Sequence, residues 1–171
     1  QALRCAPFWM LWALNLLAVA SMFVIMVHIV PHASDLGVAT LQAAGILSTI
    51  GGVSMLGRFS VGFAIDWIGS RRCMQICLVI LLASFIWLPM ARDAWMLYAF
   101  ATIYGIAHGG IFTVISPIVA ELFGIRSHGA LFGVVAFGGT VGGAIGPILA
   151  GLVFDVTLSY HLIFMALIGL A

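Results

Sequence analysis

Hydrophobic residues occupy long blocks of this chain, and short polar segments separate the blocks. About 20 apolar residues in a helix are enough to cross the roughly 30 Å of hydrocarbon in a bilayer. Backbone groups in lipid need partners within their own segment, so these blocks are predicted to be helices. A membrane barrel would show short alternating strands instead. Complete spans are expected at residues 8–30, 41–65, 73–91, 95–120 and 131–154, and an incomplete sixth at residues 160–171.

Composition supports a membrane location. Of the 171 residues, 64% are hydrophobic and only 6% are charged, whereas soluble domains carry about 25% charged residues. A soluble fold could not bury so much apolar surface, so the protein is expected to lie in a lipid bilayer. The net charge of +1 provides no basic surface for nucleic acid.

The charged residues between the spans predict the orientation. Arg4, Arg71, Arg72 and Arg126 fall on one side of the predicted membrane, and Arg92 alone falls on the other. Positive charge concentrates on the cytoplasmic side of membrane proteins. We therefore expect a multi-pass integral membrane protein whose N-terminal residues lie in the cytoplasm.

The connection between the second and third spans carries the sequence GFAIDWIGSRR at residues 62–72. Gly62 lets a neighbouring helix approach closely, and Gly69 permits a tight reversal. Asp66 can accept hydrogen bonds from the amides at a helix N-terminus or from an arginine. Arg71 and Arg72 hold the segment in the cytoplasm. The alternative interpretation is an ordinary basic loop.

This segment resembles the conserved loop motif of the major facilitator superfamily, Gly-x-x-x-Asp-x-x-Gly-x-Arg-Arg. Trp67 and Ser70 stand where the family often has basic residues, a weakening typical of the C-terminal half of such proteins. Further similarity covers nearly the whole chain and indicates the bacterial branch close to monocarboxylate transporters and oxalate/formate exchangers. It lies at residues 7–11 (PFWML), 28–38 (HIVPHASDLGV), 120–129 (AELFGIRSHG) and 154–160 (FDVTLSY).

The resemblance implies an all-α fold, a six-helix half bundle built from two three-helix inverted repeats. Residues 1–171 would form a single transmembrane half-domain of a twelve-helix protein. Its partner would be a missing N-terminal six-helix half, with the substrate bound between the halves. The expected location is the bacterial inner membrane.

Arg58 is the main candidate for substrate binding. An arginine inside a span costs at least about 2.5–3.5 kcal/mol on insertion scales, so it should face protein or water. Helical spacing places it on one stripe with Gly51, Ser54 and Gly62, and these small residues leave room beside a guanidinium that can grip a carboxylate. The resemblance also implies a carboxylate-binding arginine here, with Ser54 where some relatives carry an acid. The alternative is a structural arginine that reaches the cytoplasmic interface.

His108 lies near the middle of the fourth span, and Tyr104 lies one turn earlier on the same face. Both are candidates for lining the transport path. A packing histidine with a satisfied hydrogen bond is the alternative.

His28 and His32 have the spacing of two metal ligands on a helix. Pro31 is expected to break the helix between them, and no third ligand is near. We therefore predict no metal site.

The fifth span is rich in glycine at four-residue spacing, which creates a flat face for close helix contact. Gly142, Gly146 and Pro147 are expected to allow this span to pack closely and to bend. The alternative is a packing face alone.

No catalytic spacing of Ser, His and acids and no phosphate loop is present, so neither an enzyme nor a cofactor is predicted. The predicted function is secondary active transport of a small organic anion, a monocarboxylate or dicarboxylate, by proton symport or exchange. Arg58 would bind the substrate charge, Gly51 and Ser54 would give space, and the loop residues Asp66, Arg71 and Arg72 would form a cytoplasmic latch.

Three alternatives remain open. A carrier of neutral or cationic drug-like solutes would need an intramembrane acid, which no span has in its middle. The second alternative is a channel or a non-transporting membrane scaffold. A channel would need rings of polar groups along a pore. A membrane-embedded enzyme would need paired acids or metal ligands.

Overall fold

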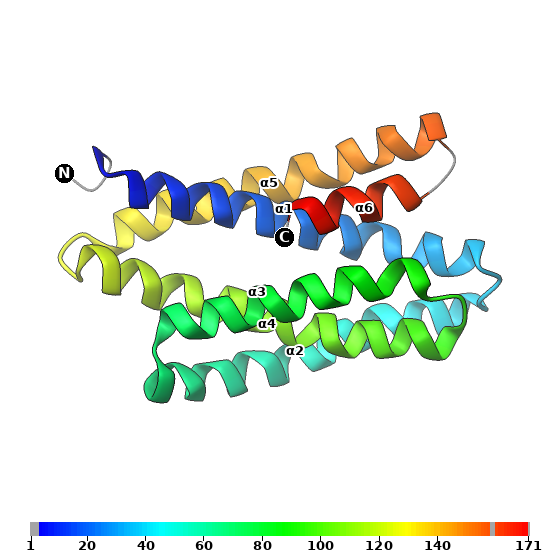
Figure 1. The fold of residues 1–171 in the computed structure, drawn as a ribbon, viewed down its shortest axis with the longest axis horizontal. Coiled ribbons are helices and arrows are strands. Elements are labelled where there is room, and N and C mark those ends of the chain that lie inside the picture. The colour runs from blue at the N-terminus through cyan, green and yellow to red at the C-terminus, as the bar shows by residue number, and fades with distance from the viewer. Residues whose placement is uncertain (1–3, 158–159, 171) are drawn as a thin grey trace.

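The computed structural model describes residues 4–157 and 160–170, and within these ranges it contains helices and no strand (Figure 1). Five of the helices are long and apolar enough to cross a membrane, which confirms the expected all-α membrane fold. The order is α1 (Ala6–Asp35), α2 (Thr40–Ile68), α3 (Ser70–Trp87), the one-turn 3-10 helix η2 (Leu88–Met90), α4 (Ala94–Phe123), α5 (His128–Thr157) and α6 (His161–Leu170).

Helices α1, α2, α4 and α5 extend beyond the apolar spans at both ends, whereas α3 ends at Trp87, before the end of its predicted span at residue 91. The expected break of the helix at Pro31 is wrong. Helix α1 continues through Pro31 to Asp35, because a proline near a helix end removes only one backbone hydrogen bond there. The connection to α2 is therefore residues 36–39 rather than 31–40. Between α2 and α3 the chain reverses at Gly69 alone, whose φ of 84° is easily reached only by glycine.

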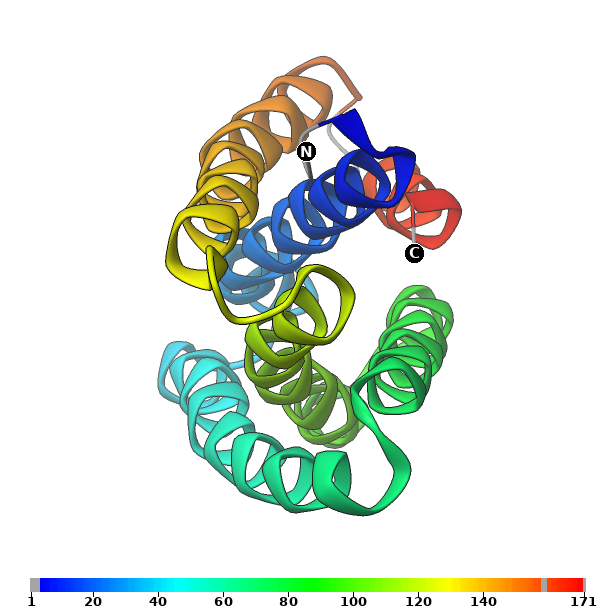
Figure 2. The same ribbon diagram turned by 90° about the vertical axis from the view of Figure 1, so that its left-hand side faces the viewer.

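Four long helices form an arc, which is visible when the molecule is viewed from the end that carries the N-terminus (Figure 2). The order along the arc is α5, α1, α4 and α2, while α3 and α6 lie together on one side of it. The same end of the bundle carries the turn at Gly69 and the α4–α5 connection at residues 124–127 (Figure 1). The arc leaves its other face without a covering helix from this chain.

The two three-helix units, α1–α3 and α4–α6, exchange helices with one another. Helix α2 packs chiefly on α4, and α5 packs chiefly on α1. The second helix of each unit therefore lies against the first helix of the other, a reciprocal arrangement that fits two related repeats. Buried apolar side chains from both units join in one core, which fixes the positions of α1 and α4 at the centre of the arc.

Candidate functional site

The close packing of α2 against α4 positions the candidate arginine. A Cβ added at Gly109 would collide with the backbone carbonyl of Ser54, and one added at Gly57 would lie 2.5 Å from the carbonyl oxygen of Ile106. The backbones of the two helices therefore touch at this level, as small residues permit in membranes. Residues on α2 beside this seam consequently lie next to the side chains of α4.

Arg58 is exposed on α2 and contacts α4 through an aromatic ring. Its Cζ lies 5.8 Å from the centroid of the Phe112 ring. A guanidinium at this separation from an aromatic face is held by about 0.5–1 kcal/mol at an exposed site. Among the described residues Arg58 has no side-chain ion pair or hydrogen bond, so its donors are available to a ligand.

The structure places the residues of the predicted stripe around Arg58 in different surroundings. Gly51 is exposed with open space around it, and a Cβ at Gly62 would just reach Thr113 at 4.0 Å. Ser54, in contrast, is buried in the seam with α4, and its hydroxyl donates to the carbonyl of Gly51 at 2.8 Å. Gly51 and Gly62 thus leave room beside Arg58, while Ser54 contributes to helix packing.

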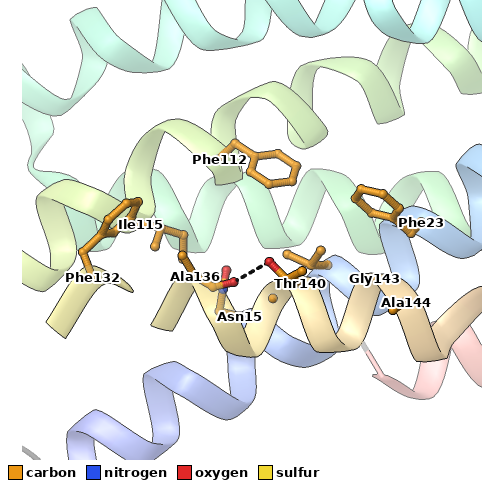
Figure 3. A pocket seen from close by; sticks show the side chains of 11 residues that line it. Asn15, Phe23, Phe112, Ile115, Phe132, Ala136, Thr140, Gly143 and Ala144 are labelled. Carbon is orange, nitrogen blue, oxygen red and sulfur yellow. Dashed lines mark hydrogen bonds between the residues drawn. The ribbon is translucent and has the colours of Figure 1, made fainter. Parts of the chain in front are cut away.

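An open-sided cavity of about 460 Å³ lies between α1, α4 and α5 (Figure 3), and Arg58 is not part of its lining. Phe112 links the two features, since it lines the cavity and also contacts Arg58. Phe23 from α1 faces the same space, and α5 presents Ala136 and Thr140 from the other side. The volume falls in the range of roughly 300–1,000 Å³ that is typical of small-molecule sites.

An aromatic row on α4 leads to Phe112. The ring centroids of Tyr104 and His108 are 5.7 Å apart, and those of His108 and Phe112 are 5.2 Å apart. His108 is half-buried, and its Nδ1 is buried without a hydrogen-bond partner among the described residues. His108 lies one helical turn from Phe112, which contacts Arg58 and lines the cavity.

Tyr104 differs from the expectation that it borders the path. It is fully buried, and its hydroxyl donates to the carbonyl of Met22 on α1 at 2.8 Å. Its ring also stacks on Phe100 at 5.3 Å. Tyr104 thus connects α4 to α1 in the core and has no contact with the cavity.

A polar clasp joins the start of α3 to the end of α4. The Ser70 hydroxyl donates to Oε2 of Glu121, and Nε of Arg71 lies 3.5 Å from Oε1 of the same carboxylate. Asp66 is exposed, and within residues 4–157 and 160–170 its side chain makes no hydrogen bond or ion pair. Within this chain, therefore, Glu121 rather than Asp66 receives the polar contacts of the loop motif.

Removing one member of this clasp is expected to have a small, specific effect. Arg71→Gln should lower the free energy of unfolding by about 0.2–1 kcal/mol, since both partners are largely solvent-exposed. The matched control Arg72→Gln alters an exposed arginine without a partner in the described structure and should change it less. Denaturant titration of the purified protein in micelles measures both values. Equal losses in the two variants would show that the Arg71–Glu121 pair contributes nothing.

Helix α5 meets α1 along its glycine face. A Cβ on Gly142 would collide with the carbonyl oxygen of Leu16, and one on Gly146 would lie 2.7 Å from that of Ala20. Pro147 lies inside the continuous helix α5, and its carbonyl is 3.2 Å from Nε2 of His28 on α1. The glycines therefore act in close packing, and His28 is used between helices.

The sequence interpretation missed Phe112, Phe23 and Glu121 as site residues. Phe112 is one turn beyond His108 on the same face of α4, and this spacing was the available signal. Glu121 is an acid near the end of a predicted span, within reach of a predicted basic loop. Phe23 had no signal, because the helix that faces it is distant in sequence.

Comparison with known proteins identifies the family. The chain matches the Major Facilitator Superfamily over residues 3–171. The chain belongs to the major facilitator superfamily. This agrees with the reciprocal packing of its helices.

Among superfamily relatives, the chain is 31% identical over 147 residues to Monocarboxylate transporter 12 from Rattus norvegicus. The matched region covers 81% of this chain and 29% of that protein. It is 30% identical over 145 residues to Monocarboxylate transporter 7 from Homo sapiens, covering 82% and 28%. It is 29% identical over 150 residues to the uncharacterized MFS-type transporter YcxA from Bacillus subtilis, covering 84% and 36%. The chain thus spans about a third or less of the length of these relatives.

Proposed function

We propose that this chain forms one half of a secondary active transporter that moves a small organic anion, a monocarboxylate or dicarboxylate, by alternating access. The observation that carries the proposal is the exposed Arg58 in an apolar membrane helix, beside a cavity of about 460 Å³. Membership of the superfamily and the names of the relatives support a carrier of this kind. Proton symport or exchange would drive it.

The chemistry of Arg58 favours a carboxylate ligand. A buried or partly buried arginine within a span needs an anionic partner or water to offset its insertion cost. Its planar fork presents parallel N–H donors that match the two oxygens of a carboxylate. The aromatic face of Phe112 holds the guanidinium in place without using these donors. The arginine is therefore oriented and still able to bind.

The neighbouring residues have distinct roles in this proposal. Gly51 and Gly62 leave space for the bound carboxylate, and the unpaired Nδ1 of His108 is the nearest further polar group along α4. Ser54 lies in the seam between α2 and α4, and Tyr104 bonds α4 to α1, so both residues belong to the helix contacts that hold the site. The clasp of Arg71 with Glu121 fixes the cytoplasmic ends of the helices.

The open face of the arc is where the partner half would dock. It presents the central helices α1 and α4 on the side opposite to α3 and α6 (Figure 2). An N-terminal six-helix half would complete the substrate site there. Asp66 and Arg72, which are exposed here, would join the latch across that interface. The proposed location is a bacterial inner membrane.

Transport by the full-length protein tests the proposal. Proteoliposomes preloaded with an unlabelled carboxylate should accumulate the labelled carboxylate by counterflow, and residues 1–171 alone should not, because the site lies between two halves. A parallel assay with a labelled organic cation should show no accumulation. Counterflow of the cation and not of any carboxylate would favour the drug-like carrier instead.

The orientation has a direct test. Cysteine introduced at Asp35 should react with an impermeant maleimide added outside intact cells, and cysteine at Arg72 should not, because the basic segments remain in the cytoplasm. Both positions are exposed in the structure. The background should lack Cys5, Cys73 and Cys77. Labelling at position 72 alone would reverse the orientation.

A further inference from the structure

His108 is an ionisable side chain in the middle of a membrane span. It lies near the midpoint of α4, whereas the five acidic residues of the chain lie at or near the ends of helices. A histidine gains or loses its charge between about pH 5 and pH 8, a range in which an arginine stays charged. His28, nearer the end of α1, has its Nε2 at the carbonyl of Pro147. Ionisable groups at mid-membrane mark paths for substrates or protons, and His108 is the described residue that fits a proton.

Packing alone does not account for this histidine. A neutral imidazole has one donor and one acceptor nitrogen, and buried polar atoms in folded proteins nearly always have a partner. Nδ1 of His108 is buried without one among the described residues. The rings of Tyr104 and Phe112, at 5.7 Å and 5.2 Å, orient the imidazole without using that nitrogen. The side chain is therefore held in place while one of its nitrogens has no protein partner.

Arg58 is the charged side chain that acts on His108. Among the described residues it is the one charged group with an electrostatic effect on this histidine, and both side chains contact the ring of Phe112. Two positive charges that share this part of the membrane repel each other. A carboxylate bound on Arg58 would offset its charge and weaken that repulsion. An anion on Arg58 and a proton on His108 consequently favour each other.

The other titratable neighbours in the described part of the chain are placed differently. Tyr104 is fully buried, and its hydroxyl donates to a backbone carbonyl of α1. Cys77 of α3 faces Gly110, which lies about 200° around α4 from His108. The side chains that α1 and α5 contribute to the cavity are neither acidic nor basic. Arg58 of α2 is therefore the neighbour that connects His108 to anion binding.

We propose that His108 binds a proton that is transported together with the anion, so that the carrier is a proton symporter. This rests on the proposed role of Arg58 and adds the coupling site to it. The proton passes from water on one side of the membrane to a ring nitrogen of His108 and returns to water on the other side. The anion makes the same passage on Arg58, and none of its bonds is formed or broken. By linkage, each ligand tightens the binding of the other by the same factor.

Calorimetry at several pH values tests this linkage. Glycolate, and oxalate in a second series, are titrated into the purified full-length protein in nanodiscs, in buffers that differ in ionisation enthalpy. Binding should take up protons from the buffer, to a limit of about one per anion, and affinity should rise by at least about tenfold from pH 8 to pH 6, because a single linked proton can change it by up to about tenfold per pH unit. Binding without proton uptake and without pH dependence overturns the proposal.

A variant that cannot become charged assigns the proton to His108. His108→Gln keeps a polar side chain, and it should bind glycolate at pH 8 with little change but take up no proton. The control His32→Gln should keep the uptake: Nε2 of His32 is also buried without a partner in the described structure, but His32 lies near Asp35 and does not line the cavity. If His108→Gln does not fold, His108→Asn is used. Proton uptake that persists in a folded His108 variant overturns the assignment.

Transport separates coupling from binding. Proteoliposomes of the wild-type full-length protein should accumulate labelled glycolate under an inward proton gradient, above the level of protein-free vesicles. His108→Gln should lose this accumulation and keep counterflow, because exchange of one anion for another needs no net movement of protons. Gradient-driven accumulation equal to that of the wild type would contradict a coupling role for His108.

The role of Arg58 is measured separately. If anion binding depends on Arg58 but takes up no proton, only the proposal for His108 fails. If Arg58→Ala binds glycolate as the wild type does, or if the wild type binds neither anion, the proposed anion site itself fails.

Discussion

Replacement of Arg58 by lysine in the full-length protein is expected to lower carboxylate affinity by about tenfold or more. Lysine keeps the charge but loses the paired donors of the guanidinium, and each 1.4 kcal/mol corresponds to about a factor of ten. It also changes the cation–π contact with Phe112, in which Cζ of Arg58 lies 5.8 Å from the ring centroid. Calorimetric titration of purified protein, normalised to the folded fraction, measures the affinity.

Arg58→Ala separates a substrate role from a structural one. If Arg58 binds the carboxylate, alanine abolishes anion binding and leaves folding near normal, because an uncompensated intramembrane charge has been removed. If the arginine only reaches the interface, lysine substitutes well and alanine harms expression before binding. Arg126→Lys, at an exposed loop position, is the matched control. Unchanged affinity in both Arg58 variants would remove the main support for an anionic substrate.

Gly142→Ala on α5 is expected to lower the free energy of unfolding by about 1–3 kcal/mol, the range for overpacking a well-packed contact. The added Cβ would collide with the carbonyl of Leu16, a backbone atom that cannot rotate away. Unfolding of the purified protein in mixed micelles, followed by far-UV circular dichroism, measures the loss.

Gly133→Ala is the control on the same helix, and it should act in the opposite direction. A Cβ at Gly133 would meet nothing within 4 Å. Alanine in a helix interior is favoured over glycine by roughly 0.5–1 kcal/mol. The two substitutions therefore differ in sign as well as size. Similar effects of both would mean that α1 and α5 are not in backbone contact at Gly142.

Local properties of the chain were predictable because the bilayer imposes them. A long apolar run must be helical in lipid whatever packs against it, and five such helices are present in the described residues. Gly69 was expected to reverse the chain and does so with a positive φ. Helix ends were less predictable, since hydropathy marks the part within lipid and α1 continues past Pro31.

The candidate site was predictable only one helix at a time. Arg58 stood out as a charge in an apolar span, and its own helix suggested the open space at Gly51 and Gly62. The same stripe included Ser54, which the structure places in the seam with α4, because helical spacing alone does not show which face of α2 meets another helix. Tyr104 faces the core rather than the expected transport path, and its hydroxyl donates to a backbone carbonyl of α1.

The sequence by itself determined the membrane setting, the helical class, the superfamily motif at residues 62–72 and the single charge of Arg58 in the second span. Each of these depends only on residues that are close together along the chain. Only the tertiary structure decided which residues share the site. Phe112 joins Arg58 to a cavity whose other walls come from α1 and α5, and Glu121 takes the polar contacts expected of Asp66. These pairings arise because α2 packs on α4 and α5 on α1, and helical periodicity fixes the face of a residue but not the helix that it meets.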